Sequence, residues 1–231
     1  MRQLLVSVFI LFISATSLAQ NVREIMPVDW NEVQKTAQND PQRIRDLVAR
    51  LSADEIDTAM TWNERIFAYY GQSYFTPMTE LFEGRELDKL FNEKKYEECL
   101  AGAKELLKKN PLSLKALSNA AFSISRMVKD SANCVNVSLE EGQMYYNRMQ
   151  RIFNTIATTG EGTKEDPFYV TAVSDEYLFL YYYLDIWKVA SQSLVGNCDL
   201  LELKEKSEYY DRPQIYFEIT RVLEIESGML K

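Results

Sequence analysis

Two adjacent acids, Asp175 and Glu176, followed by Tyr177, come nearest to a catalytic motif in this chain. A pair of carboxyl groups can cleave a glycosidic bond when the two lie about 5 to 10 Å apart across a sugar. Adjacent residues on a helix do not face each other, so one of these acids would need a partner from elsewhere in the chain. Acids in the first turn of a helix also offset the positive end of its dipole. We therefore expect both acids to serve as first-turn charges of a helix, with carboxylate catalysis as the alternative.

Tyrosines gather in two segments that could form a recognition surface. One is "YLFLYYYLDIW" (177–187), which includes Tyr181, and the other is "RIFAYYGQSYF" (65–75). Tyr and Trp combine a flat apolar face with a polar end, which suits them to bind sugars or protein partners. Aromatic residues that cover a sheet give the same pattern, so core packing is the main expectation. The residues of the second segment expected to reach a surface are Tyr69, Tyr70 and Tyr74.

The chain contains no histidine, which excludes several chemistries. Ser-His-Asp and Cys-His catalysis, histidine-ligated zinc or haem, and the usual side chain that titrates near neutral pH are all removed. The segment "TGEGTKED" (159–166) has glycines and acids that could hold a phosphate or a cation. It lacks the Lys-Ser/Thr ending of a phosphate-binding loop and the alternation of a calcium-binding loop. We therefore expect a turn there, and neither a metal site nor a cofactor.

The three cysteines, Cys99, Cys134 and Cys198, are too widely spaced for a metal-binding or CxxC motif. Cys134 and Cys198 both have loop-like neighbours, so they are the better pair for a disulfide bond in an exported protein. Spacing alone does not establish that they are close, so this bond is a hypothesis. Cys99 falls within a helical apolar pattern and is expected to be a small core residue.

The N-terminal residues 1–19 have the layout of a secretory signal peptide. Arg2 precedes an apolar run from Leu4 to Ile13, and small residues come before Gln20. That run is shorter than the roughly 20 apolar residues of a membrane-spanning helix, and no second long run follows. We expect an exported protein, periplasmic or extracellular, without a membrane span. Its net charge of −8 disfavours binding to nucleic acid or anionic lipid.

Residues 20–158 are expected to form a helical region. Asp40 followed by Pro41 is typical of a helix start, and the helix predicted there runs to Leu51. The patterns "SADE" (52–55) and "TWNE" (61–64) place a hydroxyl three residues before Glu, so each predicts a short helix. Apolar residues at helical spacing predict four further helices, at 85–93, 96–110, 112–128 and 139–157.

The helices from 85 to 128 resemble the tetratricopeptide repeat. The matching or near-matching positions are Leu87, Phe91, Tyr96, Cys99, Ala103, Leu106 and Pro111, with Ala121 and Ile124 fitting a following unit. The match spans about one and a half units, whereas a stable array needs roughly three. We therefore expect a compact core with repeat-like packing, and a peptide-binding groove as the alternative.

Residues 159–231 are expected to form an α+β region continuous with the helices. Residues 168–173 predict a strand, and 174–187 predict a helix with Ser174 as its N-cap, a strand being the alternative. Further strands are predicted within 191–195, 198–205 and 213–225. The expected fold class is α+β, in which a mostly helical, repeat-like N-terminal part packs on a small C-terminal antiparallel sheet.

Three segments together resemble one protein family. They are "IATTGEGTKEDPFYVTAVSDEYLFLYYYL" (156–184), "RIFAYYGQSYFTP" (65–77) and the terminal "CDLLEL…IYFEIT". They are similar to exported bacterial proteins, typical of Bacteroidetes, that are grouped only as a domain of unknown function. The resemblance extends over most of the chain after the leader. It implies repeat-like helices and a small C-terminal sheet, and it supplies no activity and no catalytic residue.

Without a catalytic signature, the helical hairpins and the tyrosines favour a non-enzymatic exported protein that binds another protein. The ligand- or partner-binding residues would be Tyr69, Tyr70, Tyr74, Asp175, Glu176, Tyr177 and Tyr181. One alternative is a carboxylate-based hydrolase that acts on glycans. Another is a module that binds a small ligand in an apolar cavity between the helices and the sheet. Nothing in the sequence indicates an oligomeric state.

Overall fold

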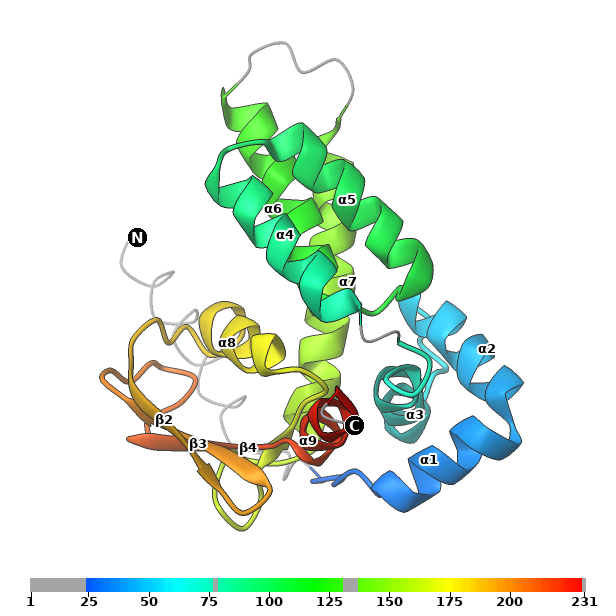
Figure 1. Ribbon diagram of the computed structural model, residues 1–231, viewed down its shortest axis with the longest axis vertical. Coiled ribbons are helices and arrows are strands. Elements are labelled where there is room, and N and C mark those ends of the chain that lie inside the picture. Colours follow the sequence, from blue (N-terminus) through cyan, green and yellow to red (C-terminus); the bar gives the residue numbers. More distant parts are fainter. Residues whose placement is uncertain (1–23, 77–78, 131–136, 230–231) are drawn as a thin grey trace, which may run out of the picture.

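The computed structural model describes residues 24–76, 79–130 and 137–229 (Figure 1). The predicted signal peptide, residues 1–19, therefore lies outside the described residues. In Figure 1 the helices α4 to α7 form an elongated bundle. Below it, the sheet and α8 lie on one side and α1 to α3 on the other, and α7 extends down between them. Within the described ranges, no helix is long and apolar enough to cross a membrane.

Local capping signals determine where the first helices begin. These helices are α1 (Trp30–Asn39), α2 (Pro41–Ser52) and α3 (Trp62–Gln72). The Asp40 side chain accepts a hydrogen bond from the backbone N–H of Arg43 at 3.1 Å and so caps α2. Thr61 and Glu64 form the reciprocal bonds of a capping box at the start of α3. Both predicted helix starts are confirmed.

The prediction that the pattern at 52–55 opens a short helix is wrong. Ser52 ends α2, and residues 53–55 form bends rather than a helical turn. The reason is a long-range contact that the local pattern does not contain. The guanidinium group of Arg151 donates hydrogen bonds to the backbone carbonyls of Leu51, Ala53 and Asp54, which holds this segment in a bent path.

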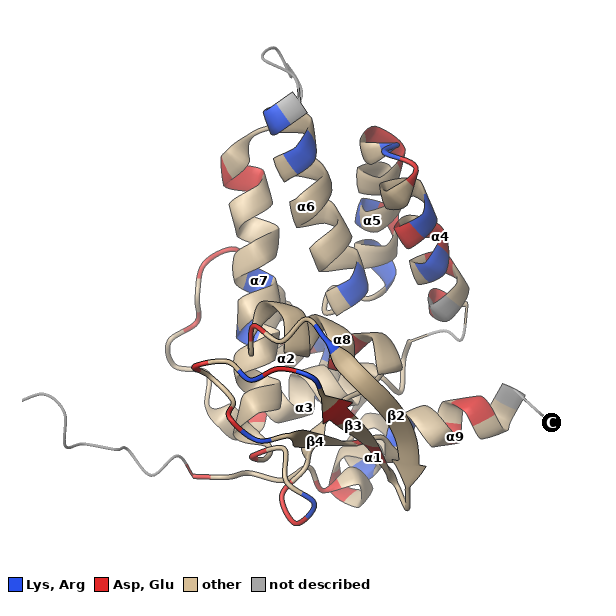
Figure 2. Ribbon diagram, turned by 90° about the vertical axis from the view of Figure 1, so that its left-hand side faces the viewer, with Lys and Arg blue, Asp and Glu red and all other residues tan. Residues whose placement is uncertain are grey.

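The next four helices pair into two hairpins. They are α4 (Glu80–Asn92), α5 (Tyr96–Lys109), α6 (Leu114–Asp130) and α7 (Leu139–Thr158). Small buried residues on facing sides, Cys99, Ala103 and Ala120, let the helices approach closely. Figure 2 shows basic and acidic residues interspersed on α4 and α5, as on solvated helix faces. The four predicted helices are confirmed.

The C-terminal sheet has four strands in the order β1-β4-β3-β2. They are β1 (Phe168–Tyr169), β2 (Val189–Val195), β3 (Cys198–Leu203) and β4 (Gln214–Glu218). The turn between β2 and β3 uses Gly196, whose φ of 65° favours glycine. The α+β class is confirmed, but the expected wholly antiparallel sheet is wrong, because β1 pairs with β4 in parallel. Helix α8 follows β1, and such a crossover connection is what parallel pairing requires.

Strand predictions in this region are too long. The strand predicted at 168–173 is β1, which ends at Tyr169. Helix α8 (Val173–Tyr182) confirms the helix predicted at 174–187 but ends at Tyr182, and its N-cap is Ala172 and not Ser174. The predicted strand 213–225 stops at Glu218, and α9 (Thr220–Met229) follows. The Glu218 carboxylate accepts hydrogen bonds from the backbone N–H and the hydroxyl of Thr220, so it turns the chain into α9.

One hydrophobic cluster joins the helices to the sheet. Phe153 on α7 contacts Phe179 on α8, with 5.8 Å between ring centroids. Phe179 in turn lies 5.0 Å from Phe168 on β1 and 6.2 Å from Phe217 on β4. Phe153, Phe179 and Phe217 are fully buried. This packing positions α8 against both the bundle and the sheet, and so determines where its acids lie.

Candidate functional site

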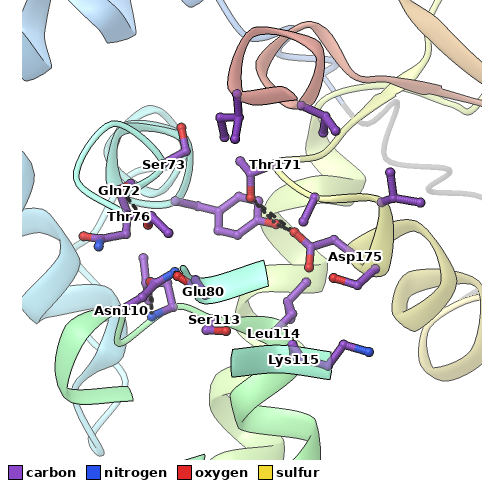
Figure 3. Close-up of a pocket in the computed structure, with 18 of the residues that line it drawn as sticks. Gln72, Ser73, Thr76, Glu80, Asn110, Ser113, Leu114, Lys115, Thr171 and Asp175 are labelled. Carbon is purple, nitrogen blue, oxygen red and sulfur yellow. Dashed lines mark hydrogen bonds between the residues drawn. The ribbon is translucent and has the colours of Figure 1, made fainter. Parts of the chain in front are cut away.

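A cavity of about 440 Å³ lies at the junction between the helices and the C-terminal region. It is bounded by α3, the start of α4, the turn between α5 and α6, the start of α8, and α9 (Figure 3). Its apolar walls include Leu112, Leu114, Val173, Val222 and Ile225. Its polar groups include Gln72, Ser73, Thr76, Asn110, Ser113 and Thr171. Apolar walls with a few polar groups are the usual form of a small-molecule site.

Asp175, in the first turn of α8, is a buried acid that lines this cavity. The Tyr69 hydroxyl donates a hydrogen bond to its Oδ2 atom at 2.7 Å, and the Thr171 hydroxyl donates to the same atom at 3.2 Å. Burial raises the pKa of Asp175 to about 6, against the opposing effect of these two hydrogen bonds. Asp175 therefore titrates close to neutral pH. This is the range in which histidine ordinarily titrates, and the chain contains no histidine.

Glu80, in the first turn of α4, is a second acid in the same cavity. Both of its carboxylate oxygens accept hydrogen bonds from Nδ2 of Asn110, at 3.1 and 3.0 Å. Burial raises the pKa of Glu80, and the charge of Asp175 adds to the rise. Figure 3 shows Glu80 with Asn110 on one side of the space and Asp175 with Thr171 on the other.

The basic groups at this cavity do not neutralise the two acids. Lys115 forms its ion pair with Asp88, at 2.8 Å, and its charge lowers the pKa of Asp175 without offsetting the effect of burial. Arg85 is exposed to solvent. Within the described residues, neither Glu80 nor Asp175 makes an ion pair, and their hydrogen-bond donors are neutral side chains. The inner cavity is therefore an acidic site with apolar walls.

A second acid pair lies behind α8, away from the cavity. Glu176 is fully buried, and Nε2 of Gln192 donates to its Oε2 atom at 3.2 Å and to Oδ2 of Asp199 at 2.7 Å. Burial raises the pKa of Glu176 to about 10, and Asp199 adds to the rise. Oε1 of Glu176 has no hydrogen-bond partner among the described residues. Asp175 and Glu176 therefore face different surroundings and are not a catalytic pair.

A family model described as "Domain of unknown function (DUF4919)" matches residues 32–228. The chain belongs to this family. No curated protein and no solved structure matches it. The resemblance to a domain of unknown function is confirmed, whereas the Bacteroidetes origin and the repeat-like character of the helices stay predictions. The DUF4919 match includes the cavity residues from Tyr69 to Glu226.

The DUF4919 structure changes the expectation for the tyrosines of α3. Tyr69 and Tyr70 are buried, so the prediction that they reach a surface is wrong. The Tyr70 hydroxyl donates to the carbonyl of Tyr169, and its ring packs edge-on against Trp30, which ties α3 to α1 and the sheet. Tyr69 is turned toward Asp175 instead of solvent. Tyr74 is half-buried, and the guanidinium group of Arg221 lies over its ring, with 4.1 Å between Cζ of Arg221 and the centroid of the Tyr74 ring.

The remaining predicted site residues lie apart from the cavity. Tyr177 donates a hydrogen bond to Oε1 of Gln192 at 2.6 Å and so belongs with the Glu176 pair. Tyr181 stacks on Trp187 at the other end of α8. Cys198 begins β3, whereas Cys134 lies outside the described residues, so their disulfide bond stays a prediction. Among the described residues, no cluster of His, Cys, Asp or Glu could hold a metal ion.

Sequence reasoning missed Glu80 and Asn110. The signal that could have found Glu80 is its position in the first turn of α4, directly after Thr79. Asn110 ends α5, and its Oδ1 atom accepts from the backbone N–H of Leu112. This bond to Leu112 is enough to explain an Asn at a helix end. The other contact of Asn110, with Glu80, is therefore not apparent from the sequence.

Proposed function

We propose that this DUF4919 protein is an exported binding protein for a small ligand that carries an ammonium group on an apolar body. The observation that supports this most is the pair of acids, Asp175 and Glu80, held in one cavity by neutral hydrogen-bond donors. Export rests on the predicted signal peptide, residues 1–19.

The charge of the ligand is inferred from the desolvation of the two acids. Both have raised pKa values because burial disfavours their ionised forms, and neither acid makes an ion pair within the described residues. An ammonium group placed between them would supply a positive charge through charge-assisted hydrogen bonds. The walls formed by Leu114, Val222 and Ile225 would contact an aliphatic part of the ligand.

The protein-partner hypothesis has less support than the small-ligand one. Two of the residues expected on a partner-binding surface, Tyr69 and Tyr70, are buried. The cavity contains two of the predicted site residues, Tyr69 and Asp175, and its volume lies in the range of small-molecule pockets.

Substitution of Asp175 by Asn is expected to weaken amine binding. The probes are hexylamine, hexanol and hexanoate, which share one apolar chain and differ in charge. Calorimetric titration at pH 7.5 is expected to show binding of hexylamine in preference to the other two. In Asp175→Asn, its affinity falls about tenfold or more, because an amide replaces a charged acceptor.

The matched control is Asp46→Asn, an equal change at an exposed acid on α2. It leaves hexylamine affinity unchanged if the cavity is the site. The proposal fails if hexylamine does not bind at millimolar concentration, if hexanoate binds as well as hexylamine, or if the two Asn variants behave alike.

A carboxylate-based hydrolase is the second candidate, because two acids with raised pKa values share one cavity. It ranks below binding, since glycoside cleavage uses one carboxyl group that is protonated and one that is ionised. Hydrolysis of 4-nitrophenyl glycosides that is lost in both Asp175→Asn and Glu80→Gln would favour it. Equal, background-level rates in the wild type and both variants would remove it.

A further inference from the structure

A second hollow, independent of the cavity, lies between α7, the end of α8 and the loop that precedes β4. Its volume is about 1360 Å³. Aromatic side chains from all three segments line it, namely Tyr146, Tyr181, Tyr182, Trp187, Tyr209 and Tyr210. We call this hollow the aromatic groove. Its most exposed large hydrophobic side chains are Tyr209, at 62%, and Trp187, at 52%.

Trp187 presents one open face to the aromatic groove. Its other face stacks on Tyr181, with 5.0 Å between centroids and 1° between ring planes. Tyr182 lies 5.5 Å from Trp187 and 6.3 Å from Tyr181, so it sits beside this stack and not over the outer face. With half of the residue exposed, the outer face of the indole ring is accessible to a ligand.

The indole ring is also held in place before any ligand arrives. Its Nε1 atom donates a hydrogen bond to Oδ1 of Asp185 at 2.8 Å, and its backbone N–H donates to Oε1 of Glu205 at 2.7 Å. Asp185 has a φ of 53°, an uncommon conformation for a residue other than glycine, and it directs the chain into this turn. A ring fixed in advance loses little conformational entropy on binding.

The rim of the aromatic groove is polar and acidic. Asp185, Glu208 and Asp211 offer carboxylate acceptors, and Gln150 offers an amide. The one basic residue that lines it in the described chain, Arg212, is paired with Glu161 at 2.9 Å. This charge disfavours phosphates, nucleic acids and anionic sugars. Carboxylates next to the central ring also differ from the core of a protein–protein interface, from which charged residues are depleted.

We propose that the aromatic groove binds a neutral oligosaccharide, with one pyranose ring stacked on the outer face of Trp187. The C–H face of a pyranose is flat and apolar and suits an aromatic ring, while its hydroxyl groups donate hydrogen bonds outward. The rim acids accept those hydrogen bonds. Tyr209 lies on the loop side of the groove, where it contacts the next sugar unit.

The probes for this site are cellohexaose, xylohexaose and mannohexaose, with oligogalacturonate as the anionic counterpart. Calorimetric titration is expected to give a dissociation constant below about 1 mM for at least one neutral hexaose and no binding of oligogalacturonate. Trp187→Ala weakens that binding about tenfold or more, because the stacking face is lost. The binding also shifts the tryptophan fluorescence of the wild type but not that of Trp187→Ala.

Trp62→Ala is the matched control, since Trp62 is an exposed tryptophan on α3 and does not line the aromatic groove. It keeps full affinity for the hexaose. Trp187→Ala retains the wild-type melting temperature because the side chain is largely outside the core, so a loss of binding does not reflect unfolding. The proposal is overturned if no neutral hexaose binds, if both Ala variants lose affinity equally, or if the groove binds only peptides.

Discussion

Replacement of Arg151 by Met is expected to lower the free energy of unfolding by about 2 to 3 kcal/mol. Arg151 is buried on α7, and its guanidinium group donates to the carbonyls of Leu51, Ala53 and Asp54 at 3.1, 2.5 and 3.0 Å. Methionine keeps the apolar length of the side chain and leaves the three carbonyls without their donor. Urea denaturation followed by circular dichroism measures the loss as a lower midpoint at an unchanged slope.

The control for this change is Arg126→Met, because Arg126 is exposed on α6. It is expected to alter stability by less than about 0.5 kcal/mol. Equal midpoints for the two variants would contradict the role of Arg151 in holding the end of α2 against α7.

Substitution of Glu176 by Gln is expected to stabilise the protein at neutral pH. Glu176 has a pKa of about 10 in the folded chain and an ordinary value near 4.5 when unfolded. Between these values the folded state holds a proton that the unfolded state has released, so stability falls as pH rises. Between the two pKa values, the free energy of unfolding of the wild type falls by up to about 1.4 kcal/mol per pH unit. Gln has no carboxyl proton to lose, and it keeps the size and shape of the Glu176 side chain.

At pH 7 we therefore expect Glu176→Gln to be about 2 to 3 kcal/mol more stable than the wild type, with the difference vanishing near pH 4.5. Chemical denaturation at several pH values between 4.5 and 8 measures both curves. Glu97→Gln, at an exposed first-turn acid of α5, is the control and should follow the wild type. A variant that is less stable at pH 7, or that keeps the wild-type pH slope, would show that Glu176 is ionised in the fold.

The parts of the fold that local signals determine were predictable. Asp40 and Thr61 cap helices through contacts made within three residues, so the pattern is present in the sequence itself. The buried face of α7 repeats at helical spacing, with Met149, Ile152 and Ile156 all fully buried.

The parts that depend on long-range contacts were not predictable. Ile219 fits both the alternation of β4 and the apolar face of α9, and the capping bond from Thr220 to Glu218 ends the strand. Likewise, no local feature indicates that the two residues of β1 pair in parallel with a strand near the C-terminus.

The candidate site was predictable only in part. The motif around Asp175 drew attention to a residue that lines the cavity. Its burial was not expected, because a charge in the first turn of a helix explains an acid there without burial. Glu80 comes from a different helix, early in the bundle, and only the packing of α8 against the bundle places the two acids in one cavity. Tyr69 was expected at a surface because of its type, whereas its hydroxyl is used inside, on Asp175.

The most direct test of the account is the pH dependence of hexylamine binding, measured by calorimetry from pH 5 to pH 7 in two buffers of different ionisation enthalpy. Asp175 has a pKa of about 6 without ligand, and an ammonium group binds its ionised form. The ionised fraction rises from about 0.1 to about 0.9 over this range, so affinity rises about tenfold. Protons are released on binding near pH 6. Asp175→Asn abolishes most of the rise in affinity with pH and most of the proton release. An affinity that is flat or falls with pH, with no proton release in the wild type, would contradict the account.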